Sequence, residues 1–263
     1  MPAARKESER TKSPVSKGKS AMPVADLACH PLSFDMAEVF DEQQDAPGLT
    51  KGQRTLLKVK AAVARALEQT PYQMLRISDV ADQAQISYGL FYHYYKDKER
   101  ATVEVLLDFL EHLEKTYAQI HVSDDDYASL YQPNLFYLDV NRRNAGLIRA
   151  CLTVSEEVES FREQYTLLID RWHRRMAQSI RRNQKTTDEL LPDAELVAYG
   201  VGGMIDQYCR QVYAQQNPFL SRLIENTHHF AETVSIMWYR AVYGRSPTKQ
   251  QILNCRPDHK SGE

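Results

Sequence analysis

The feature that most constrains this chain is a helical spacing of apolar residues that continues from about residue 50 to about residue 243. Its first stretch stops at Pro71 and places apolar residues at steps of three and four: Leu56, Val59, Val63, Ala66 and Leu67. No segment shows the convincing period of two that a half-buried strand has, and no repeat of fixed length occurs. The sequence therefore predicts an all-α protein.

The same spacing divides the chain into segments. Two short helices are expected between Pro71 and Asp97, then a helix to about 118, and further helices over about 125–140, 143–154, 156–184, 192–215 and 219–243. Residues 34–45 are acidic and predict one or two weak helical turns. We expect a disordered tail over 1–48, a small helical unit over 49–98, a larger helical domain over 99–245 and a flexible C-terminal tail over 246–263.

Composition excludes several classes of protein. The formal net charge is −2, so a nucleic-acid surface has to be local. The four cysteines, Cys29, Cys151, Cys209 and Cys255, show no C-x-x-C spacing, and their scatter fits a reducing compartment. No apolar run is long enough to cross a membrane. No motif for a catalytic triad, a metalloprotease or a phosphate loop occurs. We expect a soluble, cytoplasmic protein that is not an enzyme and has no metal site or cofactor.

Two short helices joined by a tight turn, between two longer helices, predict a three-helix helix-turn-helix unit that binds DNA. The second short helix predicts the surface that contacts the DNA. It reads Ser87-Tyr88-Gly89-Leu90-Phe91-Tyr92-His93-Tyr94-Tyr95, and its helical projection places Leu90, Phe91 and Tyr95 toward the core. The other face carries hydroxyl and imidazole groups, which bond to phosphates and base edges. On composition alone the segment is also compatible with an aromatic core helix. The candidate DNA contacts are Arg76, Ser87, Tyr88, Gly89, Tyr92, His93, Lys96 and Lys98.

Charge favours the DNA-binding interpretation. Residues 51–100 hold nine basic and five acidic side chains, a local excess of four positive charges in a chain that is negative overall. Lys98 lies in the first turn of the following helix, where free backbone N–H groups favour an anion and a cation is poorly placed. A phosphate bound there would compensate for that placement.

The order of these elements resembles the TetR family of bacterial transcriptional regulators. The resemblance covers about residues 50–107 and rests on three runs: Thr50 to Thr55, Ile77-x-x-Val80-Ala81-x-x-Ala84-x-Ile86-Ser87, and Gly89-Leu90-Phe91-Tyr92-x-Tyr94-Tyr95-x-x-Lys98-Glu99. It implies a homodimer whose N-terminal units bind an inverted repeat in double-stranded DNA. It also implies a C-terminal domain that binds a small effector and releases the DNA. By position, Tyr92 and Lys98 would contact phosphates, and Tyr88, Gly89 and His93 would lie near base edges.

Three residues depart from the family pattern. Pro71 and Gln85 stand where glycine is common, and Arg76 stands where Thr or Ser often caps the second helix. The lost cap is expected to cost about 1 kcal/mol, although Arg76 has the length to reach a phosphate. A left-handed Gln85 would carry a strain of about 1 kcal/mol.

The C-terminal domain predicts a dimer interface and a pocket. The predicted dimer contacts are a stripe of apolar residues over 197–212, with the small residues Ala194, Ala198 and Gly202 beside it, and the apolar face of the last helix. The alternative is that both surfaces pack within one subunit. The candidate ligand contacts are Phe109, Leu113, Tyr131, Cys151, Tyr165, Trp172 and Tyr199. Each is also an ordinary core residue by type. Their aromatic, uncharged character predicts a hydrophobic effector.

The basic run from Arg171 to Arg182 would favour an anionic effector such as an acyl-CoA, unless it is only a solvated helix face. The function predicted first is a ligand-responsive transcriptional repressor. An activator is not distinguished from a repressor by sequence. The alternative is a helical ligand-binding or adaptor protein whose DNA-binding unit is degenerate, which the residues at 71, 76 and 85 would favour.

Overall fold

A computed structural model of the chain describes residues 30–121, 123–184, 193–224 and 226–257, and within these ranges it contains helices and no strand. The prediction of an all-α fold is confirmed. The elements are α1 (Met36–Gln44), α2 (Lys51–Gln69), η1 (Tyr72–Met74), α3 (Ile77–Gln83), α4 (Tyr88–Tyr94), α5 (Lys98–Tyr117), α6 (Ala128–Arg143), α7 (Ala145–Glu157), α8 (Glu159–Gln184), α9 (Ala194–Cys209), the π-helical η2 (Arg210–Ala214), α10 (Pro218–Ser221), α11 (Thr227–Tyr243) and α12 (Lys249–Asn254).

Polar caps fix where the helices of the N-terminal unit begin. Thr50 and Gln53 form a reciprocal capping box at the start of α2. The Ser87 hydroxyl accepts from the Leu90 amide at 3.2 Å, and the Asp97 carboxylate accepts from the Arg100 amide at 2.8 Å. Serine and aspartate are preferred at this position, and each cap satisfies an amide that has no partner within its helix.

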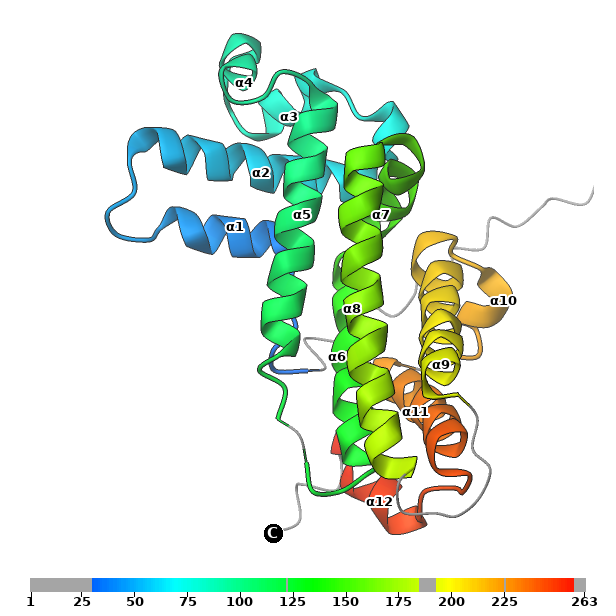
Figure 1. The fold of residues 1–263 in the computed structure, drawn as a ribbon. Coiled ribbons are helices and arrows are strands. Elements are labelled where there is room, and N and C mark those ends of the chain that lie inside the picture. The colour runs from blue at the N-terminus through cyan, green and yellow to red at the C-terminus, as the bar shows by residue number, and fades with distance from the viewer. Residues whose placement is uncertain (1–29, 122, 185–192, 225, 258–263) are drawn as a thin grey trace, which may run out of the picture.

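The helices form a small unit and a larger bundle (Figure 1). α5 and α8 run upright and side by side through the molecule, with α3 and α4 at one end and α12 at the other. α1 and α2 lie across α5, and α9 and α11 pack on the opposite side of α8. This arrangement holds the short α3–α4 pair at one end of the molecule, well away from α9 and α11.

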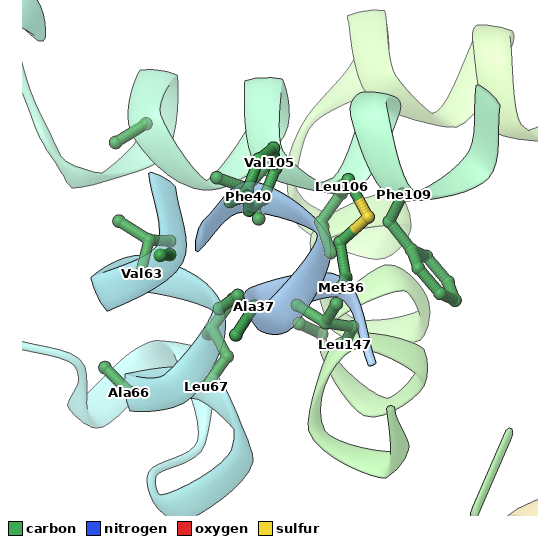
Figure 2. Close-up of a cluster of buried hydrophobic side chains, with 14 of the residues drawn as sticks. Met36, Ala37, Phe40, Val63, Ala66, Leu67, Val105, Leu106, Phe109 and Leu147 are labelled. Atoms are coloured by element: carbon green, nitrogen blue, oxygen red, sulfur yellow. The ribbon is translucent and has the colours of Figure 1, made fainter. Parts of the chain in front are cut away.

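α1 corrects the predicted tail. The disordered segment was expected to extend to residue 48, but Met36–Gln44 is a helix capped by Asp35. Its side chains Met36, Ala37 and Phe40 are buried between α2, α5 and α7 (Figure 2). Three buried side chains in nine residues give this helix an apolar face, and packing compensates for its weak intrinsic preference. Residues 1–29 of the predicted tail lie outside the described ranges.

The C-terminal part differs from expectation in two places. The helix predicted over 219–243 is two helices, because Asn226 caps a new one at Thr227. The tail predicted from residue 246 contains α12, which starts with a capping box between Thr248 and Gln251. Among the described residues, no helix is long and apolar enough to cross a membrane.

Candidate nucleic-acid interface and ligand cavity

The turn between α3 and α4 is closed by backbone hydrogen bonds. The Ile86 amide donates to the Ala81 carbonyl at 3.0 Å, and the Gln85 amide donates to the Asp82 carbonyl at 3.1 Å. These two hydrogen bonds form the pattern of a Schellman motif, in which the residue that follows the helix C-cap is left-handed. Gln85 has that conformation, with φ of 54°. The residue that departs from the family pattern therefore makes the expected turn, at a strain of about 1 kcal/mol.

The exposed face of α4 carries most of the predicted base and phosphate contacts. Phe91 and Tyr95 are buried, whereas Tyr88 is 54% and Tyr92 is 44% exposed. Their two hydroxyls lie 3.1 Å apart and form a hydrogen bond. Gly89 and His93 are exposed beside them, and a methyl group at Gly89 would meet no atom within 4 Å. Leu90 was expected in the core but is 37% exposed, so it belongs to this outer face.

Cationic side chains surround α4. Gly52 of α2 lies close to the Tyr94 hydroxyl, which places the first turn of α2, with exposed Lys51 and Arg54, beside α4. Arg76 and Lys96 are exposed before and after the helix-turn-helix, and Arg76 precedes α3 without making a side-chain cap. Among the described residues, none of these four cations takes part in an ion pair. Their charges are available to phosphate groups.

Lys98 is placed differently from the other predicted contacts. Its ammonium donates to the carbonyls of Tyr72, Gln73 and Leu75 at 3.2, 3.0 and 3.3 Å, and it lies over the Tyr72 ring. These carbonyls end the η1 turn, so Lys98 ties the start of α5 to the loop before α3. The structure therefore gives this cation a partner inside the protein.

A cavity lies in the C-terminal domain between α5, α7 and α8, with α6 and α9 each contributing one side chain. Four of the predicted ligand contacts line it: Leu113, Cys151, Tyr165 and Trp172. The sequence did not single out nine further lining residues: Leu110, Glu114, Tyr117, Tyr137, Ile148, Leu168, Ile169, His173 and Asp206. The steps of three and four from Tyr165 to Trp172 and from Leu113 to Tyr117 were a usable signal for some of them.

The other three predicted ligand contacts lie elsewhere. Phe109 is buried in the core beside Phe34. The Tyr131 hydroxyl contacts His228 at 2.9 Å, between α6 and α11. Tyr199 is 44% exposed, stacks on His173 at 4.0 Å between ring centroids and donates to Asp170. These three side chains serve packing and surface contacts in this conformation.

Two carboxylates line the cavity, Glu114 and Asp206, and Asp206 is the one that forms no ion pair among the described residues. Its carboxylate accepts a hydrogen bond of 2.7 Å from the Tyr137 hydroxyl. Burial raises the pKa of Asp206, and the hydrogen bond opposes that shift. Burial also raises the pKa of Tyr117 to about 12. Burial raises the pKa of Tyr137 as well, so both tyrosine hydroxyls are neutral near neutral pH.

The basic run on α8 is a paired surface. Arg171 and Arg175 contact Glu114 of α5, Arg174 contacts Asp170, and Arg181 contacts Glu195 of α9. Each of these four arginines forms an ion pair with an acidic side chain on the surface, which agrees with the simpler expectation of a solvated helix face. Among the described residues, no group of three or more His, Cys, Asp or Glu side chains is placed to hold a metal ion.

The small unit and the larger bundle meet where α2 ends and α7 begins. The Glu68 carboxylate accepts from the Gly146 and Leu147 amides at 2.8 and 3.3 Å. A methyl group at Gly146 would lie 2.3 Å from the Leu67 carbonyl oxygen, so only glycine fits. Asn144 is buried beside it, accepts from the Met36 amide and donates to the Phe34 carbonyl. We call this contact region, with Glu68, Asn144, Gly146 and Leu147, the α2–α7 junction.

Comparison with known proteins gives matches in structure alone. No family model and no curated protein sequence matches the chain. A transcriptional regulator from Rhodococcus sp. Rha1 aligns with a TM-score of 0.58 at 14% identity, covering 75% of this chain and 100% of its own. A TetR-like regulator from Rhodococcus sp. RHA1 aligns at 0.56 with 15% identity, over 75% and 100% of the two chains.

A third structure, the regulator FadR from Bacillus subtilis in complex with stearoyl-CoA, aligns with a TM-score of 0.51 at 15% identity, over 71% of this chain and 98% of that one. These similarities define an all-helical fold with an N-terminal helix-turn-helix. It is the fold of TetR-like transcriptional regulators, and the resemblance seen in the sequence is confirmed at the level of the fold.

Proposed function

We propose that this protein is a DNA-binding transcriptional regulator, a repressor that leaves an inverted-repeat operator when a small effector with a large apolar part binds its C-terminal domain. The observation that carries the proposal is the exposed face of α4, where Tyr88, Tyr92 and His93 stand free of the core. α4 is seven residues long, starts at a Ser87 cap and follows a closed turn, as a helix that enters the major groove does.

The test is selection of bound double-stranded DNA from a random pool by the full chain. We expect an inverted repeat with a fixed spacing of half-sites, and an affinity that falls steeply with salt because phosphate contacts dominate. Absence of salt-sensitive, sequence-selective binding would instead support a helical ligand-binding or adaptor protein with a degenerate DNA-binding unit.

Paired variants separate phosphate contacts from general effects of charge. Lys96→Ala is expected to weaken binding to all sequences alike and to lower the salt slope by about 1. Lys249→Ala removes the same charge from α12, at the far end of the molecule, and is expected to leave the slope unchanged (Figure 1). Tyr88→Phe and His93→Ala are expected to change which bases are selected.

The same proposal requires two copies of the chain, because an inverted repeat presents two half-sites about one helical turn apart. The stripe of Ala194, Ala198 and Gly202 that was predicted for the dimer packs inside the subunit, where Gly202 faces His173. We assign the contact to the opposite face of α9 and to α11. Leu196 is 74% exposed there and Gly200 and Gly203 border open space, while α11 exposes Met237.

Sedimentation of two arginine variants tests this assignment. Gly203→Arg has room in the subunit but would block close approach of a second helix, so we expect a folded monomer with weakened DNA binding. Gln164→Arg puts the same side chain on the exposed surface of α8, and this control is expected to remain a dimer. A dimeric Gly203→Arg variant would refute the assigned face.

A further inference from the structure

The cavity in the C-terminal domain combines apolar walls with one acidic group. Leu110 and Leu113 of α5, Ile148 of α7 and Leu168 of α8 provide aliphatic surface. The cavity volume is about 50 Å³ in this conformation, room for a few water molecules. A ligand with an apolar body needs more space, and half-buried lining residues such as Leu113 and Trp172 are the side chains with freedom to provide it.

Asp206 reaches this cavity from α9. The hydrogen bond from Tyr137 satisfies one carboxylate oxygen, and no ion pair joins Asp206 to a Lys, Arg or His among the described residues. Arg210, one turn further along the chain, is exposed and forms no ion pair with Asp206, although its charge and that of His173 act on Asp206 from a distance and oppose the upward shift of its pKa. The His173 ring donates through Nδ1 to the Ile169 carbonyl, at 2.8 Å. The pKa of Asp206 is raised despite these contacts, so desolvation of the carboxylate exceeds the compensation that the protein provides, and a bound cation would supply more.

Aromatic rings stand next to this carboxylate. The Trp172 ring lies 5.4 Å from the Tyr137 ring and 5.5 Å from the Tyr117 ring, measured between centroids. The faces of tryptophan and tyrosine rings attract cations, most strongly where water is excluded. Tyr137 thus contributes both a ring to this cluster and the hydroxyl that holds the Asp206 carboxylate in place.

The other charged lining residue is already neutralised. Glu114 of α5 contacts Arg175 at 2.6 Å and Arg171 at 3.6 Å, across the edge of the cavity. The lining contains no lysine or arginine side chain. The charged lining group that forms no ion pair is therefore negative, which disfavours an anionic head group inside the cavity.

We propose that the effector cavity selects an organic cation, a protonated amine on an apolar body, whose charged group lies between Asp206 and the rings of Tyr137 and Trp172. This assignment rests on the proposed function, since it names the chemical class of the effector. It sharpens the expectation of a hydrophobic ligand and disfavours the acyl-CoA class considered from the basic run on α8.

Four probes that each contain a chain of eight carbons test the choice of head group: n-octylammonium, 1-octanol, octanoate and octanoyl-CoA. Titration calorimetry on the full chain near pH 7 measures their dissociation constants. We expect octylammonium to bind at least about tenfold more tightly than octanol, because a charge-assisted hydrogen bond exceeds a neutral one, and octanoate to bind most weakly. Equal affinity for octylammonium and octanoate, or a preference for octanoyl-CoA, would overturn the proposal.

Two Asp→Asn variants locate the preference. Asp206→Asn keeps an acceptor for the Tyr137 hydroxyl and is expected to lose the tenfold advantage of octylammonium over octanol. Asp124→Asn changes an exposed carboxylate outside the cavity and is expected to keep it. Thermal unfolding of both variants checks that they are folded. An unchanged preference in a folded Asp206→Asn variant would refute the role of Asp206.

The binding experiment contains no DNA, so its outcome is independent of the regulator proposal. A chain that selects octylammonium but no DNA sequence keeps the cation site and loses the proposed function. A chain that selects an inverted repeat but binds octanoate equally well keeps the proposed function and loses the cation site.

Discussion

The α2–α7 junction and the ligand cavity share a helix, α7, but are built in opposite ways. At the junction, Gly146 leaves no room for a methyl group and the Glu68 carboxylate is bonded to two amides. At the cavity, Ile148 and Cys151 of the same helix face an incompletely filled space with a carboxylate that forms no ion pair among the described residues. The contrast teaches that α7 is held firmly at one end and loosely along its side, so we expect a molecule that binds there to displace the loose contacts first.

Equal truncations in the two regions give the largest expected difference. Leu147 is fully buried at the junction, and Leu147→Ala is expected to cost about 3 kcal/mol of unfolding free energy. Leu113→Ala removes a half-buried side chain from the cavity wall and is expected to cost about 1 kcal/mol. Chemical denaturation measures both, and similar losses would remove the contrast between the regions.

Adding a methyl group examines the tightness of the junction. Gly146→Ala would force the new carbon against the Leu67 carbonyl and the Glu68 backbone, with an expected loss of about 2 kcal/mol. Gly89→Ala in α4 meets open space and is expected to gain up to about 1 kcal/mol through helix propensity. Thermal denaturation of the two variants compares them directly, and a Gly146→Ala variant as stable as the parent would contradict the close contact.

Asn144 connects α1 to the junction. Asn144→Ala leaves the buried Met36 amide and Phe34 carbonyl without this partner, at an expected cost of about 2 kcal/mol. Hydrogen exchange is expected to speed up in α1 before it does in α8. Asn254→Ala on the exposed side of α12 serves as the control and is expected to leave exchange in α1 unchanged. Unaltered protection of α1 in the Asn144→Ala variant would show that the apolar face alone holds this helix.

The smallest expected effect is at Asp206 and depends on pH. Because burial raises the pKa of Asp206, the folded protein holds a proton that the unfolded chain has already lost, and stability falls as pH rises through that interval. The Asp206→Asn variant has no carboxyl group at this position, so it does not lose this stability as the pH rises. It is expected to exceed the parent in stability by about 1 kcal/mol near pH 7 and to match it near pH 4, where an unfolded aspartate titrates. Urea denaturation at the two pH values checks the sign.

Periodicity and capping residues predicted most of the fold. The helices from α2 to α9 follow directly from apolar spacing, and Ser87, Asp97 and the left-handed Gln85 behave as their residue types and positions indicate. α1 was predicted only as one or two weak turns within a disordered tail, because its sequence is acidic and its helix depends on burial of Met36 and Phe40 against residues distant in sequence. Tertiary contact, rather than local preference, decides that segment.

The candidate sites were predicted unequally for a similar reason. The outer face of α4 is a property of one helix, so its projection separates Tyr88 and Tyr92 from Phe91. The cavity combines side chains of five helices. The sequence does not predict that Tyr137 of α6 lies within hydrogen-bond distance of Asp206 of α9. Lys98 shows the same limit, because its three carbonyl partners lie about 25 residues earlier in the chain.

Of the two tryptophans of the chain, one lies at the cavity and the other at the contact between α9 and α11. Trp172 lies in the cavity wall, while Trp238 is buried in α11 and donates from its indole nitrogen to the Val201 carbonyl of α9. Indole emission shifts with local polarity, so a Trp238→Phe variant would report the cavity alone and Trp172→Phe would report the α9–α11 pair. The protein thus carries two optical probes, with which the order of ligand entry and helix movement is measurable in time without any added label.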